Sequence, residues 1–322
     1  MILGFHTKQL TERGTEVALF DYALGAQELL RHEVRVFVPA TSDRILADVR
    51  RRFEDCFDVV FYDDPKSIAC DALYVIKRGR PGRITSAAPE LVHAFDDGSH
   101  PHGHRFAVVS DWIARRARRK VRLPRRHVLG VPRLKKPAVV PHMVSLPDLQ
   151  DDLREELGIP EDAVVFGRHG GLGNFDIEFV LKAVRRVLDE RQDVWFVFVN
   201  VHPFCAHRRV VYLPRLTDRA EIRRFVNTCD YMLHAHLYGE TFGLAVAEFA
   251  SVGAPVLTFL GSRLSGHLDL LQNGLRLGYR SYEDVFGYLA TLPRRREPVE
   301  SDVLVRFGRE QVMARFEDVF LR

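Results

Sequence analysis

The sequence has 322 residues, of which 46% are hydrophobic and 28% charged, with a formal net charge of +4; these values are typical of a globular protein of about two domains. No stretch approaches the ~18 apolar residues of a membrane-spanning helix, and the N-terminus lacks signal-peptide features, so we expect a cytoplasmic protein. Its four cysteines, Cys56, Cys70, Cys205 and Cys229, lie far apart without CxxC spacing, which argues against disulfides or a zinc site.

Short apolar segments alternate with helical patterns along the chain. In the first half we expect strands at 1–5, 33–40, 58–62, 72–77, 91–95 and 106–110, with helices at 15–31 and 43–53. A segment with five prolines, 123–150, then interrupts the pattern. In the second half we expect strands at 163–170, 194–201, 210–213, 230–236 and 255–259, with helices at 175–192, 218–227 and from 242 onward.

Apolar strands alternating with helices predict an α/β protein with parallel sheets covered on both faces. We therefore expect two doubly wound domains, 1–145 and 146–302, with the helical segment 303–322 packing back on the first. In such sheets, ligands bind where strands end and helices begin.

Two loops between a predicted strand and a helix contain glycine. Loop 6–16 brings Gly14 and Thr15 to a helix start but lacks the GxGxxG of a dinucleotide site, which argues against a nicotinamide enzyme. Loop 166–176 places Gly170 and Gly171 beside Arg168, so backbone and guanidinium could both meet a phosphate. The alternative is that the first is only a turn and N-cap, and the second only a loop with a solvated arginine.

Two glutamates punctuate the apolar segment 239–259. Glu240 precedes the predicted helix, and Glu248 lies eight positions later, about 80° around a helix, so the two can share one side. The amides from Thr241 to Leu244 would begin the helix without intrahelical partners and form an anion site. The alternatives are that Glu240 only caps the helix and that Glu248 lies at an exposed helix edge.

The segment "GETFGLAVAEFASVGAPVL" resembles the E-x7-E signature of retaining GT-B glycosyltransferases of the group 1 class, glycosyltransferase family 4. "FGRHGG" and "LPRLTDRAEIRRFVNTCDYMLHAH" are similar to the flanking segments of that class, and "VHAFDDGSHPHG" is similar to a branch in bacteria and large DNA viruses. The resemblance implies two Rossmann-like domains, the first binding an acceptor and the second a nucleotide sugar. It also implies transfer of a hexose from a UDP- or GDP-sugar to a glycan or lipid-linked acceptor with retention, as in polysaccharide biosynthesis.

The resemblance also implies roles for individual residues. Glu248 would bind the ribose hydroxyls, Glu240 would lie near the donor sugar, and Arg168 would neutralise charge on the leaving diphosphate. The amides of Phe242, Gly243 and Leu244 would hold the diphosphate, and the backbone from Arg215 to Thr217 would hold the base. The class usually has a lysine shortly after the arginine, and this loop has none, so Lys77 or Arg78 of the first half could supply the second positive charge.

On the acceptor side, the family often places a histidine near the reacting sugar. His93, Asp96 and His102 compete for this role in the loop 91–104, and we rank His93 first. The triplet of His100, His102 and His104 and the acidic pairs at 63–64 and 96–97 could instead hold a metal. Because a helix dipole and Arg168 can replace a metal's charge, we expect no obligatory cation.

Eleven Lys and Arg residues lie between Arg115 and Lys136. They predict either a solvated helix and linker or peripheral contact with an anionic membrane. Trp112 is the only aromatic residue close to them, which argues against nucleic-acid binding. Two further alternatives remain open: a nucleotide-sugar 2-epimerase of the same fold, and a non-enzymatic basic adaptor bound to membrane or nucleic acid.

Overall fold

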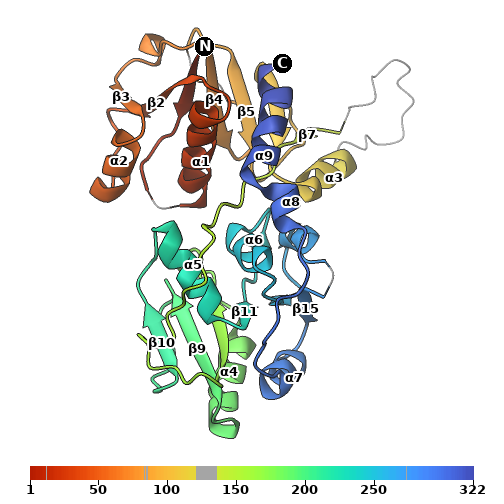
Figure 1. Ribbon diagram of the computed structural model, residues 1–322. Helices are drawn as coiled ribbons and strands as arrows, with labels where there is room; N and C mark the ends of the chain where they lie inside the picture. Colours follow the sequence, from red (N-terminus) through yellow and green to blue (C-terminus); the bar gives the residue numbers. More distant parts are fainter. Residues whose placement is uncertain (12, 83, 85, 121–135, 273) are drawn as a thin grey trace, which may run out of the picture. The chain divides into compact units, whose positions relative to one another are not determined.

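A computed structural model of the chain describes residues 1–322 except 12, 83, 85, 121–135 and 273 (Figure 1). The chain forms two compact units. Unit 1 consists of Met1–Met143 together with Phe307–Arg322, and unit 2 consists of Val144–Arg306. The boundaries predicted from the sequence follow residues 145 and 302.

Unit 1 is built on a parallel sheet of strand order β3-β2-β1-β4-β5-β6-β7. Its strands are β1 (Ile2–His6), β2 (Glu33–Pro39), β3 (Asp58–Tyr62), β4 (Ala72–Lys77), β5 (Glu90–Ala94), β6 (Arg105–Val108) and β7 (Ala138–Val139). Its helices are α1 (Gly14–Glu28), α2 (Ala47–Glu54), η1 (Pro65–Ser67), α3 (Asp111–Lys120), α9 (Arg309–Phe316) and η3 (Glu317–Leu321), and α8 (Val303–Phe307) leads back into it. Helices cover the sheet, which explains why its strands are apolar on both faces.

The last segment of the chain completes the core of unit 1. Val312, Met313, Phe316 and Phe320 are buried in the same apolar cluster as β1 and α1. The ring of Phe316 lies 5.2 Å from that of Tyr74 on β4. Figure 1 shows this segment in blue beside α1, at the opposite end of the colour scale. Residues far apart in sequence therefore share one hydrophobic core.

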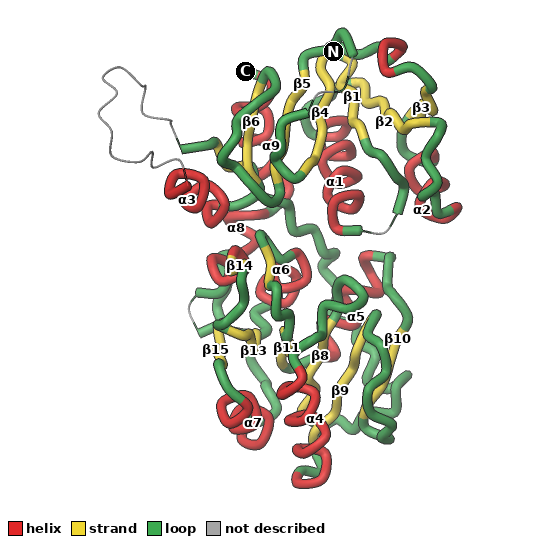
Figure 2. The backbone as a smooth tube through the Cα atoms, turned by 180° about the vertical axis from the view of Figure 1, so that it is seen from behind, coloured by secondary structure: helices red, strands yellow, loops and turns green. Residues whose placement is uncertain are grey.

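Unit 2 repeats the arrangement with a parallel sheet of order β10-β9-β8-β11-β13-β15 (Figure 2). Its strands are β8 (Val164–Arg168), β9 (Val194–Val199), β10 (Val210–Leu213), β11 (Tyr231–His234), β13 (Val256–Phe259) and β15 (Arg276–Tyr279), with the short pair β12 (Gly239–Glu240) and β14 (Leu264–Ser265). Its helices are α4 (Glu178–Glu190), α5 (Arg219–Thr228), α6 (Leu244–Ser251), η2 (Gly266–Leu270) and α7 (Tyr282–Thr291). The strand order reverses next to β8, so the carboxyl ends of β8 and β11 flank the switch point where such sheets bind ligands.

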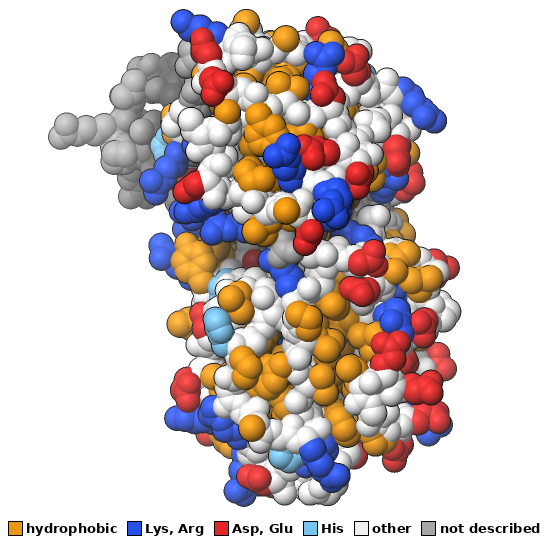
Figure 3. Space-filling view, turned by 90° about the vertical axis from the view of Figure 1, so that its left-hand side faces the viewer, with side chains coloured by type: hydrophobic (Ala, Val, Ile, Leu, Met, Phe, Trp, Pro, Cys, Tyr) orange, Lys and Arg blue, Asp and Glu red, His pale blue; other side chains and the backbone are white. Residues whose placement is uncertain are grey.

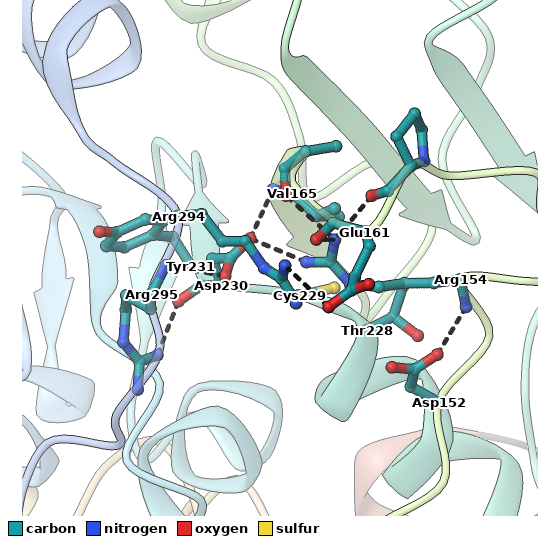
Figure 4. Close-up of polar contacts among 12 residues, drawn as sticks. Asp152, Arg154, Glu161, Val165, Thr228, Cys229, Asp230, Tyr231, Arg294 and Arg295 are labelled. Atoms are coloured by element: carbon teal, nitrogen blue, oxygen red, sulfur yellow. Dashed lines mark hydrogen bonds and ion pairs between the residues drawn. The ribbon is translucent and has the colours of Figure 1, made fainter.

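A buried carboxylate forms a hydrogen-bond network at the amino ends of the strands β8 and β11 (Figure 4). Asp230 is 5% exposed and accepts hydrogen bonds from the backbone N–H groups of Val165 and Arg295 and from the guanidinium of Arg154. Burial raises the pKa of Asp230, whereas the Val165 amide and Arg154 lower it. Asp230 directly precedes β11, and its partners lie in β8, before β8 and after α7. This network therefore joins the amino ends of β8 and β11, the strands whose carboxyl ends carry the candidate site.

The α/β prediction with two parallel sheets is confirmed, whereas several element bounds differ. The strands β7, β12, β14 and β15 were missed, because they are two to four residues long and lack an extended apolar run. The helix predicted from residue 242 begins at Leu244, because Gly243 has a left-handed backbone with a φ of 93°.

The basic segment predicted to contact a membrane lies largely at 121–135, outside the described residues. At its edges, Lys136 donates to Asp111 at 2.6 Å, and Arg116 lies over the ring of Trp112. On the face drawn in Figure 3, acidic and basic side chains are intermingled. Among the described residues, no helix combines the length and apolar character needed to cross a bilayer.

Candidate functional site

Arg168 ends β8 at the switch point of unit 2, and it is 3% exposed. Its guanidinium donates to the carbonyl oxygens of Val199 at 3.3 Å, Asn200 at 3.0 Å and Gly171 at 2.7 Å. Burial lowers the pKa of Arg168 to about 10, and the carboxylates of Glu240 and Asp176 oppose this shift, so the side chain stays charged at neutral pH. This placement excludes the alternative of a solvated loop arginine.

The glycine loop after β8 is held in one conformation by these contacts. The side-chain amide of Asn200 donates to the carbonyl of Gly170 at 2.8 Å, so β9 braces the loop from a second direction. Gly170 has a φ of 135°, which side chains rarely tolerate. A Cβ built at Gly170 would lie 3.9 Å from that of Ala245, in the first turn of α6. The loop therefore packs against the start of a helix.

The start of α6 offers backbone amides at that position. Ala247 donates to the carbonyl of Gly243 at 2.9 Å, so the amides of Leu244, Ala245 and Val246 precede the first intrahelical bond. The candidate anion site therefore differs from the predicted one, which began at Thr241. Thr241 and Phe242 lie before the helix, and Phe242 is buried. Free amides and the positive end of the helix dipole together favour an anion here.

Glu248 lies on α6 with 5% exposure, which excludes the alternative of an exposed helix edge. Its Oε1 accepts a hydrogen bond from Arg219 at 3.3 Å, and its Oε2 lies 2.9 Å from Nε2 of His169 at an angle unsuited to a hydrogen bond. The carboxylate thus has partners inside the protein, and its burial alone does not require a ligand.

Glu240 does not share the helix with Glu248. It lies in β12, which pairs in parallel with β14, and its carboxylate is 3.1 Å from Nδ1 of His236. The helical 80° argument therefore fails for this pair, because Gly243 breaks the backbone between them. Glu240 remains half-exposed and electrostatically close enough to Arg168 to oppose the fall in its pKa.

The segment expected to hold the base lies between β10 and α5. Arg215 is half-buried and Thr217 is exposed. The next residue, Asp218, caps α5 by accepting from the amides of Ala220 at 2.8 Å and Glu221 at 3.0 Å. This cap fixes the first turn of α5, from which Arg219 reaches Glu248.

Sequence reasoning missed the two residues that contact Glu248. His169 directly follows Arg168 in the glycine loop, and this position could have identified it as a candidate site residue. Arg219 is one of several arginines around α5, and nothing in the sequence distinguishes it from Arg215, Arg223 and Arg224.

In unit 1, four predicted residues lie near strand or helix ends. Gly14 begins α1 and is exposed, and the hydroxyl of Thr15 donates to the carboxylate of Glu16 at 3.0 Å. Asp96 lies two residues beyond β5 and is half-buried. Nδ1 of His102 lies 2.7 Å from the carbonyl of His100, within the loop that precedes β6.

The side chains of His93 and Lys77 both have polar partners within unit 1. His93 is fully buried on β5, with Nδ1 2.6 Å from the hydroxyl of Tyr74 and Nε2 2.8 Å from the carbonyl of Val140. Burial lowers the pKa of His93 to about 3. Lys77 pairs with Glu90 at 3.0 Å. Because His93 cannot face a sugar and the charge of Lys77 is already compensated, neither is kept in the proposed site.

The structure resembles solved glycosyltransferases over its whole length. Anabaena HepE, solved in complex with UDP, superposes with a TM-score of 0.63 at 14% identity, covering 99% of this chain and 96% of that one. The lipopolysaccharide outer core galactosyltransferase WaaB gives 0.63 at 12% identity, covering 100% and 99%. The chain has the GT-B fold.

The GT-B fold also includes proteins of other activities. A protein named as a UDP-N-acetylglucosamine 2-epimerase, from Listeria monocytogenes, superposes with a TM-score of 0.55 at 13% identity, covering 99% of this chain and 92% of that one. No protein-family profile matches the sequence, and no curated protein matches it significantly. At these identities the comparisons establish the fold, and the activity has to be argued from the site.

Proposed function

We propose that this GT-B protein is a retaining glycosyltransferase that moves a hexose from a UDP- or GDP-sugar to a glycan or lipid-linked acceptor, without an obligatory metal. Unit 2 binds the donor and unit 1 the acceptor, and the protein works in the cytoplasm, with residues 115–136 in peripheral contact with anionic membrane. No nucleic acid takes part.

The observation that supports this proposal best is the packing of the Gly170 loop against the first turn of α6. It gathers loop amides, helix amides and the Arg168 charge at the carboxyl end of β8, which suits a diphosphate. The bond from sugar to diphosphate breaks with its electrons on the diphosphate, so these groups stabilise the charge of the leaving nucleotide. HepE, one of the solved neighbours, was solved in complex with UDP and with UDP-glucose, which supports a nucleotide-sugar donor for this chain.

The remaining residues act around the diphosphate in this proposal. Glu248 accepts hydrogen bonds from the ribose hydroxyls, with His169 and Arg219 holding its carboxylate. Glu240 lies by the donor sugar, and the segment from Arg215 to Thr217 lies by the base. Gly14, Thr15, Asp96 and His102 are the unit 1 candidates for contact with donor or acceptor.

Replacing Glu248 by Gln tests the donor site. The variant keeps the side-chain shape but loses the charge that strengthens its hydrogen bonds, which are worth about 1.5–3 kcal/mol. Calorimetry should therefore show about ten- to a hundredfold weaker binding of UDP or GDP. A 2′-deoxyribose analogue should bind the unmodified protein weakly and lose little more on mutation, because both changes remove the same contact.

Glu240→Gln is the matched control, because Glu240 is assigned to the sugar rather than the nucleoside. Its turnover should fall while its UDP or GDP affinity stays within a few-fold of the unmodified protein. Since Glu248 also pairs with Arg219, melting temperatures are measured for both variants. A lower melting temperature with unchanged nucleotide affinity in Glu248→Gln would show that Glu248 is structural and would refute the assignment.

The epimerase neighbour favours one alternative function. A 2-epimerase would release an altered sugar and UDP from a nucleotide sugar in the absence of an acceptor. Incubation with UDP- and GDP-sugars in EDTA, with and without lipid-linked acceptor, distinguishes the two activities. Acceptor-dependent nucleotide release supports transfer, acceptor-free epimer formation supports the alternative, and absence of any nucleotide binding supports a non-enzymatic adaptor.

A further inference from the structure

Three side chains that offer metal-binding atoms converge beside β11 in unit 2. His234 ends β11, His236 follows two residues later, and Glu240 lies in β12. One ligand atom from each lies within 4.8 Å of the others. Two imidazoles and a carboxylate form a donor set that suits a transition-metal cation such as Zn²⁺.

The orientation of His234 is fixed by a buried chain of polar groups. The hydroxyl of Thr258 lies 3.0 Å from Nδ1 of His234 and 3.0 Å from Nε2 of His267. A hydroxyl carries one proton, so Thr258 can donate to only one of these rings and accepts from at least one of them.

The second ring nitrogen of His234 is the one left for a ligand. Nδ1 lies against the hydroxyl of Thr258. When Nδ1–H donates to that hydroxyl, Nε2 carries the lone pair that a metal needs. This buried Nε2 has no hydrogen-bond partner among the described residues.

We propose that His234, His236 and Glu240 bind one transition-metal cation of the Zn²⁺ type, with Thr258 and His267 orienting His234. Neighbouring ligands of tetrahedral zinc lie about 3.4 Å apart at ordinary bond lengths, and Nδ1 of His236 is already 3.1 Å from Oε1 of Glu240. The polar chain behind His234 matches the hydrogen-bonded support that metal-bound histidines usually have. The fourth position is open to water or to a ligand oxygen.

The charge nearby limits how tightly such a cation binds. Arg168 lies close enough to lower the pKa of His234, and its positive charge repels a dication, while the carboxylate of Glu240 attracts it. We therefore expect weaker binding than at a closed structural zinc site. The consequence for activity rests on the proposed function. A cation bound to Glu240 would keep that carboxylate from the donor sugar, so we expect Zn²⁺ to inhibit sugar transfer.

The experiment titrates the chelator-treated full-length chain with Zn²⁺ in a calorimeter and with Co²⁺ in an absorption spectrometer. We expect one Zn²⁺ per chain and visible Co²⁺ bands of a nitrogen- and oxygen-coordinated site. His236→Ala should weaken Zn²⁺ binding at least tenfold and abolish the Co²⁺ bands. Thr258→Val, which keeps all three ligands, should weaken it about ten- to a hundredfold. Melting curves establish that each variant is folded.

Two histidines serve as controls. His202 is exposed in the same unit, and His102 belongs to the histidine triplet of unit 1. His202→Ala and His102→Ala should bind Zn²⁺ as the unmodified chain does. Unchanged Zn²⁺ binding in His236→Ala, or loss of binding in His102→Ala, would overturn the proposal. UDP binding to the metal-free chain tests the donor site separately, so Zn²⁺ binding without UDP binding would support the metal site and remove only its inhibitory role.

Discussion

Arg168→Ala is expected to lower kcat/KM for sugar transfer by about 10²- to 10³-fold, or about 2.7–4 kcal/mol, because it removes a buried positive charge beside the position proposed for the departing diphosphate. The same change removes the donor to the carbonyls of Val199, Asn200 and Gly171, so the glycine loop also loses its brace. Steady-state kinetics with a UDP-sugar and acceptor measure the first effect, and thermal melting measures the second.

Arg168→Lys separates these two contributions. Lysine keeps the charge but cannot direct donors to three carbonyls at once, because its ammonium lacks the planar guanidinium fork. Kinetics near those of the unmodified protein would assign the effect to charge, and kinetics like those of the alanine variant would assign it to the loop. Arg208→Ala, at an exposed position of the same unit, is the control and should be unchanged. Unaltered kinetics in Arg168→Ala would remove Arg168 from the site.

The free energy of unfolding is expected to fall steeply as the pH drops from about 6.5 to about 4. Burial lowers the pKa of His6, His142 and His267 to about 4 and that of His93 to about 3, and it pushes the pKa of His234 well below its ordinary value. In the unfolded chain these groups titrate near pH 6.5. Between the two values the unfolded state binds more protons, so stability rises with pH and is lost on acidification.

Each histidine that stays neutral in the folded state contributes a slope of about 1.4 kcal/mol per pH unit in that window. Denaturant titrations at pH 7, 6 and 5 measure the slope, with separate fits if the units unfold in separate steps. His142→Asn should reduce the slope by about one proton, whereas His202→Gln, at an exposed position, should leave it unchanged. Equal unfolding free energies at pH 7 and pH 5 would contradict the expectation.

The sequence predicts those parts of the fold that follow from a repeating pattern. Long apolar runs such as β9 and helices with one apolar face such as α4 lie where expected within a few residues. The predicted burial of Glu248 is confirmed. Its helix is apolar on most sides and is followed by a buried strand, so the helix has no solvent-exposed face at Glu248. The two-residue strand β12 was not predictable, since its pairing with β14 depends on segments that meet only in the folded chain.

The details of the site depend on contacts that a linear pattern does not contain. His93 lies in a segment predicted to be a strand. The sequence pattern of a strand does not show that the hydroxyl of Tyr74 and the carbonyl of Val140 contact the two ring nitrogens of His93. Arg168 was predicted to meet a phosphate, with a solvated loop arginine as the alternative, but the carbonyls at the end of β9 that hold its guanidinium are brought to it only by tertiary packing. The positions of strands and helices were therefore predictable to a greater extent than the contacts of their side chains.

The division of unit 1 between the two ends of the chain affects how the protein folds during synthesis. Unit 2 is continuous from Val144 to Arg306, so a ribosome finishes it while part of unit 1 is still missing. The N-terminal part of unit 1 is made before unit 2, but Phe316 and Phe320 reach its core only when residues 307–322 emerge. Its N-terminal portion must therefore wait with apolar surface uncovered, the condition in which nascent chains aggregate or bind chaperones.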